Sequence, residues 1–300
     1  MMLLTRRACH SNGNDRLDKV QVKMKKTPLF FKFILTGLIY AVITCIVQVP
    51  LANLLYSLLG IEPDNGIKDG MVILLILTIF IVGIALAVFY YLCGHLFYSN
   101  KKWLQGIKFA AFIYLTNYIP QVFFLDATNG AAALIKGGFP VIQVELFDFV
   151  ILFITVLIMV CYLPCRYTPV TDTEKSHLVQ NLISGILFAG VLIVINELLL
   201  PVIGFENMAD GLNVAKENRM FFYLVMAAGF FITGASVSFY AIKMAELYGK
   251  KAFILLYGIL VWSIFDLTML PLGYGIIPTI LFIAASMISF SALFLVRIWN

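Results

Sequence analysis

The sequence predicts an all-α polytopic integral membrane protein with eight transmembrane helices, arranged as two parallel four-helix repeats with both chain ends in the cytoplasm. Three observations predict this fold. Hydrophobic residues make up 62% of the 300 residues and charged residues only 12%, about half the charged fraction of a typical soluble domain. The apolar residues form long runs between short polar breaks, and the second half of the chain resembles the first.

The apolar runs have the length of membrane-crossing helices. About 30 Å of hydrocarbon is spanned by roughly 20 residues of α-helix, and helices satisfy their own backbone groups within lipid. Eight segments meet this requirement: Phe30 to Leu51, Met71 to Cys93, Trp103 to Leu125, Phe139 to Leu163, Leu178 to Leu200, Phe221 to Ile242, Phe253 to Leu270 and Ile276 to Ile298.

The distribution of basic residues predicts the orientation. The predicted outer loops hold four of the 21 lysines and arginines (Lys68, Lys136, Lys216 and Arg219), which leaves 17 on the inner side. Because basic residues accumulate on the cytoplasmic side, both termini are expected inside. The net charge of +5 therefore reflects topology, and we expect no nucleic-acid partner. We expect the protein to lie in the lipid bilayer of a plasma membrane, namely a bacterial inner membrane.

Four regions follow from this reading. Residues 1–28 form a basic cytoplasmic tail, residues 29–165 the first repeat, residues 166–177 a cytoplasmic linker and residues 178–300 the second repeat. Two alternatives stay open for the first 23 residues, which are polar and irregular. They are either a translated tail, or translation begins at Met24.

The repeats are predicted from matches at an offset of about half the chain. Residues 36–40, TGLIY, correspond to residues 184–188, SGILF, at an offset of 148, and Lys101-Lys102 correspond to Lys250-Lys251 at 149. Prolines at helix ends match as well, at offsets of up to 151. Because four helices return the chain to the same side, both copies share one orientation and are related by an axis along the membrane normal.

Four acidic residues lie within the predicted spans, all in the outer half of the bilayer: Glu145, Asp148, Glu197 and Asp266. Ionisable groups in a span are costly and mark functional sites by default. Glu145 and Asp148 are three residues apart and share one helical face.

The repeat alignment places amides opposite acids. Asp266 falls opposite Asn117, and Asn196 next to Glu197 falls opposite Gln48. We therefore predict an outward-facing polar site that takes up protons or binds a small molecule or cation. The alternative is that these groups only hydrogen-bond between helices, which stabilises a contact by roughly 0.5 to 2 kcal/mol.

Cysteine and histidine residues gather at the predicted cytoplasmic ends of the second, fourth and fifth helices. They are Cys93, His95, Cys161, Cys165 and His177. Such side chains bind zinc or copper, but their spacing is not typical of a metal site. Isolated thiols in a reducing compartment are the favoured interpretation, with no metal, no cofactor and no disulfide.

The sixth predicted helix carries small residues, namely Gly229, Gly234, Ala235, Ser236 and Ser238. Because small side chains let helix backbones approach closely in a membrane, we expect this helix to pack tightly on a neighbour.

Missing motifs restrict the function. The chain has no phosphate-binding glycine loop and no Gly-x-Ser-x-Gly turn, which excludes bound-nucleotide coupling and ordinary hydrolase chemistry within it. We expect a small permease or exporter rather than an enzyme. One alternative is a non-catalytic scaffold or accessory subunit that binds a membrane-protein partner. Another is an intramembrane enzyme in which Asp148 and Asp266 share a proton, although its supporting Gly-x-Gly-Asp motif is absent.

Overall fold

The computed structural model describes residues 28–59, 71–118, 120, 138–167, 177–211, 214–244, 250–270 and 276–295, and helices are the only regular secondary structure in these ranges. Four helices are long and apolar enough to cross a membrane: Leu29–Val47, Met71–Phe97, Leu178–Val202 and Lys216–Ile242. Two shorter apolar helices, Phe149–Tyr162 and Thr279–Leu295, accompany them. The chain is therefore a helical, membrane-embedded protein.

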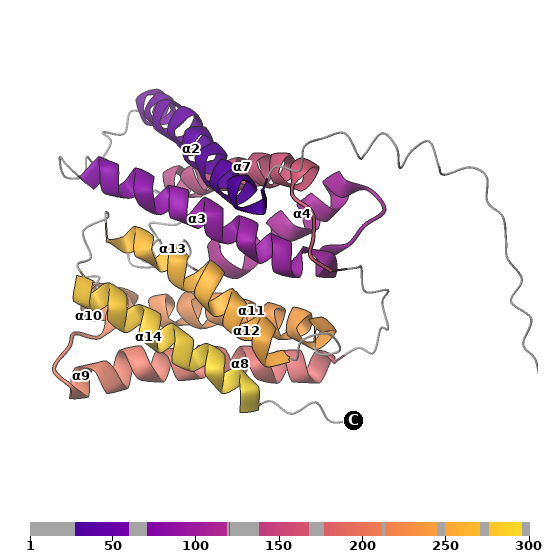
Figure 1. Ribbon diagram of the computed structural model, residues 1–300. Helices are drawn as coiled ribbons and strands as arrows, with labels where there is room; N and C mark the ends of the chain where they lie inside the picture. Colours follow the sequence, from indigo (N-terminus) through magenta and orange to yellow (C-terminus); the bar gives the residue numbers. More distant parts are fainter. Residues whose placement is uncertain are drawn as a thin grey trace, which may run out of the picture.

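Four α-helices lie in the described ranges of the first half (Figure 1). They are α2 (Leu29–Leu59), α3 (Met71–Cys93) with the 3-10 turn η1 (Gly94–Phe97), α4 (Lys102–Ile113) with the π-helical η2 (Tyr114–Tyr118), and α7 (Gly138–Tyr162).

The helices of the second half are divided into more segments (Figure 1). Helix α8 (Leu178–Val194) continues through the π-helical η3 (Ile195–Leu199) and α9 (Leu200–Val202). The short α10 (Met208–Gly211) and η4 (Lys216–Asn218) then lead to α11 (Arg219–Met244). Helix α12 (Lys250–Tyr257) continues through the π-helical η5 (Gly258–Ser263), α13 (Ile264–Asp266) and η6 (Leu267–Met269). The last helix, α14 (Ile276–Ala292), ends in η7 (Leu293–Leu295).

Helix boundaries agree with the sequence prediction at α3 and depart from it at α2. Helix α3 has the predicted ends, whereas α2 continues through Pro50 to Leu59, beyond the predicted end at Leu51. Proline has a backbone φ compatible with a helix and removes one hydrogen-bond donor. Membrane helices tolerate that loss, so Pro50 interrupts the hydrogen bonding of α2 without ending it.

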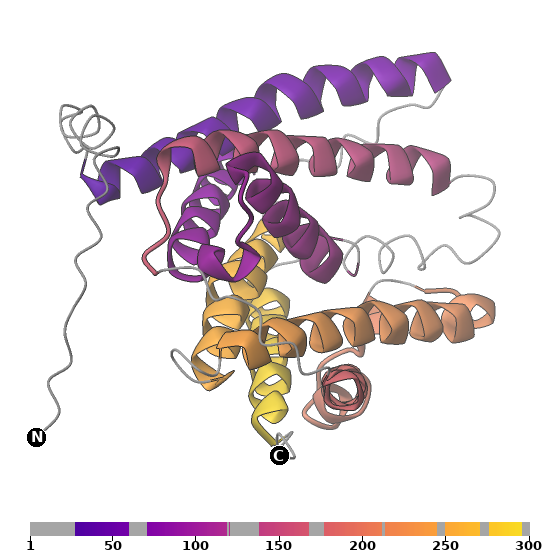
Figure 2. The same cartoon turned by 90° about the vertical axis from the view of Figure 1, so that its right-hand side faces the viewer.

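The two halves form two adjoining groups of helices. In both views α2, α3, α4 and α7 lie above α8, α11, α12 and α14 (Figures 1 and 2). Helix α2 contacts α3 and α7, and α4 contacts α7; likewise α8 contacts α11 and α14, and α12 contacts α14. Between the halves, α3 contacts η5 and α13, while α11 contacts η2. We call this region the seam.

Basic residues mark one end of the bundle. Lys32, in the first turn of α2, donates a 2.8 Å hydrogen bond to the carbonyl of Tyr162 at the end of α7. Phe97, just after α3, packs on Tyr240 near the end of α11 with ring centroids 4.6 Å apart. Lys251, the second residue of α12, lies over the ring of Phe294, which follows α14. The starts and ends of these helices therefore meet at one end, called the basic end after Lys32 and Lys251.

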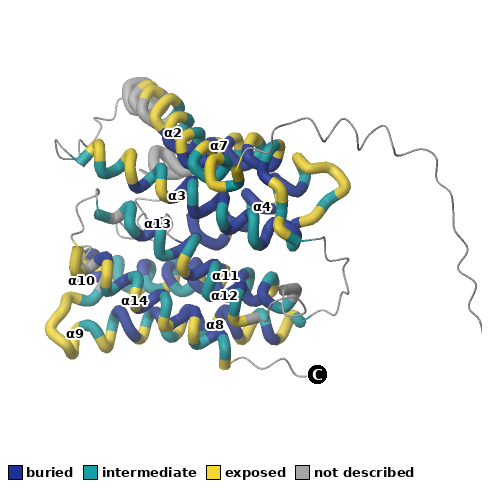
Figure 3. The backbone as a smooth tube through the Cα atoms, in the orientation of Figure 1, coloured by how far each residue is buried: buried dark blue, intermediate teal, exposed yellow. Residues whose placement is uncertain are grey.

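Exposed positions recur along the outside of the helices (Figure 3), and many of them carry large apolar side chains. Ile73 on α3, Ile186 on α8 and Ile276 on α14 expose 65 to 70% of their surface. Exposed apolar patches of this kind are rare on soluble proteins. Their natural surroundings are lipid tails, in agreement with the membrane class.

Aromatic rings fill the seam. The Phe89 ring of α3 lies 6.0 Å from that of Phe109 in α4, 5.8 Å from Phe253 in α12 and 5.9 Å from Tyr257. All four side chains are completely buried. Rings at these separations attract one another beyond the burial of their area, so the seam is a packed core and holds the halves together.

Glycines allow close contact between α2 and α3. A Cβ added to Gly83 would lie 2.8 Å from the Cα of Gly37, 2.8 Å from the Cβ of Tyr40 and 3.2 Å from the carbonyl oxygen of Thr36. Any side chain at Gly83 would therefore push the two helices apart.

The pair α8 and α11 has the same kind of contact. A Cβ added to Gly234 would lie 2.5 Å from the Cβ of Phe188, 2.9 Å from the carbonyl oxygen of Ser184 and 3.1 Å from the Cα of Gly185. The hydroxyls of Ser184 and Ser238 are hydrogen-bonded at 2.9 Å. The predicted close packing of the sixth helix is confirmed at Gly234 and Ser238.

Candidate functional site

Asp266 ends α13 and is completely buried. Helix α13 contacts α3 of the first half and α14 of the second, so the carboxyl group belongs to the seam. An acidic group in a membrane interior is costly unless it is protonated, paired or hydrogen-bonded. This makes Asp266 the strongest candidate for a functional group in the described part of the chain.

Asn117 lies on the segment that faces α13 across the seam. Its side chain is completely buried, and its Nδ2 donates a 3.3 Å hydrogen bond to the carbonyl of Val261 in η5. The neighbouring Tyr118 packs its ring 5.0 Å from that of Phe265, the residue before Asp266. The structure therefore brings η2 and the segment carrying Asp266 together.

Both sides of this contact are π-helical. The segments η2 and η5 directly follow α4 and α12, and the Asn117–Val261 hydrogen bond joins them. A π-helical turn changes which backbone carbonyls are bonded and occurs often at functional sites. The apolar windows of the sequence predict uninterrupted α-helices, so these distortions were not foreseen.

A hydrogen-bonded group centred on Thr116 connects three helices beside Asn117. Thr233 of α11 donates to the carbonyl of Thr116 at 2.7 Å, and Tyr257 of α12 donates to the Thr116 hydroxyl at 2.7 Å. The Thr116 hydroxyl donates in turn to the Phe112 carbonyl. Tyr257 also lies within electrostatic range of Asp266. The sequence prediction missed this group, because threonine and tyrosine within spans are common and carry no charge.

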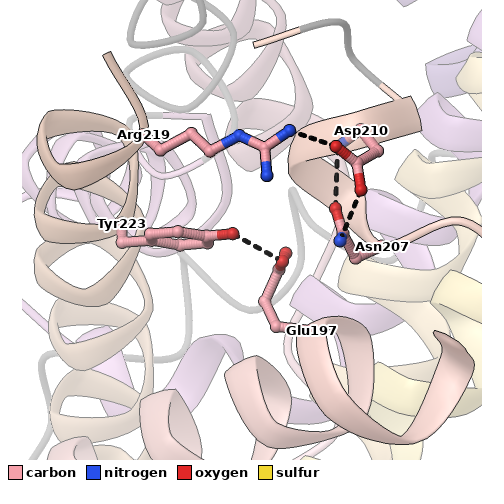
Figure 4. Close-up of polar contacts among 5 residues, drawn as sticks. All are labelled: Glu197, Asn207, Asp210, Arg219 and Tyr223. Carbon is pink, nitrogen blue, oxygen red and sulfur yellow. Dashed lines mark hydrogen bonds and ion pairs between the residues drawn. The ribbon is translucent and has the colours of Figure 1, made fainter. Parts of the chain in front are cut away.

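Glu197 lies in η3, which continues α8. The hydroxyl of Tyr223, in the second turn of α11, donates a 2.8 Å hydrogen bond to its Oε2 (Figure 4). The adjacent Asn196 is almost fully buried and donates to the carbonyl of Leu192 on its own helix. Glu197 and Asn196 therefore belong to the α8–α11 pair, whereas Asn117 belongs to the seam.

An ion pair accompanies Glu197 at the end opposite the basic end. Arg219 pairs with Asp210, and the Nδ2 of Asn207 donates to the same carboxylate at 2.7 Å (Figure 4). The charged side chains are 33% and 44% exposed. An ion pair this exposed contributes little to stability, but it fixes the short α10 next to the start of α11.

Three of the predicted site residues have side chains outside the described part of the structure. Gln48 lies in α2, and Glu145 and Asp148 lie in α7. The helices that carry them have the predicted type. The paired-carboxylate chemistry of Asp148 and Asp266 stays a prediction.

The thiol and imidazole groups lie at the basic end. Gln105 donates to the sulfur of Cys165 at 3.3 Å, and burial raises the pKa of that thiol. Cys93 and His95 are buried nearby, whereas Cys161 is exposed. Within the described ranges, no three histidine, cysteine or acidic residues are placed to hold a metal ion, and the cysteines are free thiols.

A groove of about 470 Å³ lies between α4 and α11. It begins at Lys108 and ends at Thr116, and Ala111, Ala235 and Ser236 line it. The sequence prediction that Ala235 and Ser236 serve close packing is therefore wrong: these small residues leave space beside the neighbouring helix.

Comparisons with protein-family models, with curated proteins and with solved structures found no match. The functional assignment of this chain therefore rests on its own residues.

Proposed function

We propose that the chain is a small permease or exporter with eight spans in two parallel repeats, both ends in the cytoplasm, and a site for a proton or cation at the seam. The observation that carries this proposal is the complete burial of Asp266 where the two halves meet. In a membrane protein, an acid in such a position is a candidate coupling group.

The glycine contacts support the two repeats. Gly37 and Gly185 are 148 residues apart and Gly83 and Gly234 are 151 apart, close to the offsets of the sequence matches. In each half the second glycine approaches the Cα of the first and the carbonyl of the residue before it. The neighbour relations of the helices also correspond, because α3 meets the seventh helix as α11 meets the third.

The surroundings of Asp266 support exchange of a proton or cation. An ionised carboxyl group is costly in the interior of a membrane protein, so we expect the Asp266 carboxyl to carry a proton or a cation whenever the seam is closed. Tyr257, whose hydroxyl donates to Thr116, lies within electrostatic range of Asp266, and Asn117 donates to η5, the segment just before α13. Release of the proton or cation would then require the seam to open, which couples its passage to a movement of the halves.

A scaffold or accessory subunit is the second candidate, and one observation favours it. Asp266 and Asn117 have no exposed surface and lie in closed helix contacts, as expected of groups that only join helices. In the permease proposal, the same burial corresponds to a state in which the seam is closed. The two candidates therefore differ in whether Asp266 ever exchanges its proton.

A hydrophobic carbodiimide distinguishes these candidates, since it adds to protonated carboxyl groups within membranes. Membranes containing the full chain are treated with dicyclohexylcarbodiimide at pH 6 and pH 8, and modified peptides are identified by mass spectrometry; Asp266→Asn is the matched control. For a permease we expect modification at Asp266 that decreases as the pH rises. No modification of Asp266 at either pH would remove the permease proposal and leave a packed scaffold.

Cysteine accessibility gives a second measurement without a known substrate. Single cysteines at Asn117, Glu197 and Asp266 in a cysteine-free chain are treated with an impermeant thiol reagent from outside. Labelling at Asn117 and Asp266 would show that the seam opens to water. Protection at both, with labelling at Glu197, would place water only at the outer end of the α8–α11 pair.

A further inference from the structure

The groove between α4 and α11 opens toward lipid. Leu115 and Phe239 line it and expose 46% and 43% of their surface. In a membrane-embedded protein, exposed apolar side chains of this size are in contact with lipid tails. The occupants nearest to the groove are therefore lipids.

The groove runs from the basic end into the hydrocarbon. Lys108 is its only charged lining residue, and the Lys108 ammonium donates to the carbonyl of Tyr98, which precedes α4, at 3.3 Å. The side chain thus points back toward the helix start, as lysines do when they place their charge at the interface. Thr116, at the deep end, is eight residues or about 12 Å further along the helix.

Small side chains create the space. Ala111 on α4 faces Ala235 and Ser236 on α11, whereas the contact of α3 with α12 is filled by the buried rings of Phe89 and Phe253. The volume of about 470 Å³ is in the range of ligand pockets, which are mostly apolar with few polar groups. A single cation at the interfacial end and an apolar channel below it match an anionic headgroup with an acyl chain.

We propose that this groove binds an anionic phospholipid from the leaflet at the basic end, with its phosphate beside Lys108 and an acyl chain along Ala111 and Ala235. The charge complementarity of Lys108 selects the headgroup, since no acidic residue lines the groove. This site is independent of the proposed transport function, because it requires neither opening of the seam nor a substrate.

Tryptophan quenching by brominated lipids tests the proposal. The full chain with Phe239→Trp is reconstituted into phosphatidylcholine vesicles that contain increasing fractions of brominated phosphatidylglycerol or brominated phosphatidylcholine. The quenching of the parent chain, which has three tryptophans, is subtracted. The matched control is Ile183→Trp on α8, which is 46% exposed and, like Phe239, five residues from the helix end.

The expected result is an apparent affinity for phosphatidylglycerol at Phe239→Trp about fivefold above that for phosphatidylcholine, the size of effect that one lysine at a membrane surface gives. At Ile183→Trp the two lipids should quench equally. Adding Lys108→Gln should remove the preference, and adding Ala111→Phe should fill the groove and weaken quenching by both lipids. Equal quenching by both lipids at Phe239→Trp, or a preference that survives Lys108→Gln, would overturn the proposal.

Discussion

The contact of α8 with α11 at Gly234 gives a prediction with a magnitude. In Gly234→Ala, the new Cβ would lie 2.5 Å from the Cβ of Phe188 and 2.9 Å from the carbonyl oxygen of Ser184. Because carbon atoms pack at about 3.5 to 4.0 Å, the two helices must separate by about 1 Å. Overpacking of this kind costs about 1 to 3 kcal/mol, and alanine returns up to about 1 kcal/mol through its helix propensity. We expect a net loss of roughly 1 to 2 kcal/mol in the free energy of unfolding.

Reversible unfolding in mixed micelles of mild detergent and dodecyl sulfate, followed by circular dichroism, measures this loss. Gly190→Ala is the matched control, because a Cβ at Gly190 would meet nothing within 4 Å; it should be neutral or stabilising by up to about 1 kcal/mol. Gly83→Ala should lose as much as Gly234→Ala, since its Cβ would lie 2.8 Å from the Cα of Gly37. Equal stability of Gly234→Ala and Gly190→Ala would refute the reasoning, and a neutral Gly83→Ala would refute the equivalence of the two contacts.

Other predictions concern the polar groups. Tyr223→Phe removes the hydrogen bond to Glu197 and should lower the free energy of unfolding by about 0.6 to 1.7 kcal/mol, whereas Glu197→Gln, which still accepts from Tyr223, should lower it less; the order is read from the same unfolding curves. Arg219→Gln breaks a half-exposed ion pair and should change the same free energy by less than about 1 kcal/mol at any salt concentration. The raised pKa of the Cys165 thiol predicts slow alkylation at pH 7 relative to free cysteine, with a rate that rises about tenfold per pH unit because the thiolate is the reactive form. Gln105→Leu removes a donor to that sulfur and should slow alkylation further; an unchanged rate would show that Gln105 does not stabilise the thiolate.

The membrane class and the type of each long helix followed from the sequence, because lipid requires apolar residues over a fixed length. The boundaries of α3 were predicted because Gly70 and Gly94 flank an apolar run without a charged residue. At α2 the prediction ended too early, since Pro50 weakens a membrane helix without stopping it. The membrane class and the helix boundaries depend on local composition, which can be read directly from the sequence.

The candidate site was predicted in part. Asp266 and Asn117 stood out because an acid and an amide are unusual in apolar runs, and both are completely buried in the structure. Their arrangement depends on π-helical turns, which neither hydrophobicity nor helix propensity encodes. Thr116 and Tyr257 were missed because each is ordinary in a span, and only the three-dimensional packing of η2, α11 and α12 brings their hydroxyls together.

The hydrogen bond from Asn117 to the Val261 carbonyl means that one half of the molecule helps to set the winding of a helix in the other. The carbonyl lies inside the wide turn of η5. If that turn tightened to an ordinary α-helical turn, every residue beyond it would shift by one position, which is a rotation of about 100° and a displacement of about 1.5 Å. Asp266 lies just beyond the turn. Separating the halves would therefore do more than uncover this carboxyl group, because it would also release the constraint that determines which way the group points.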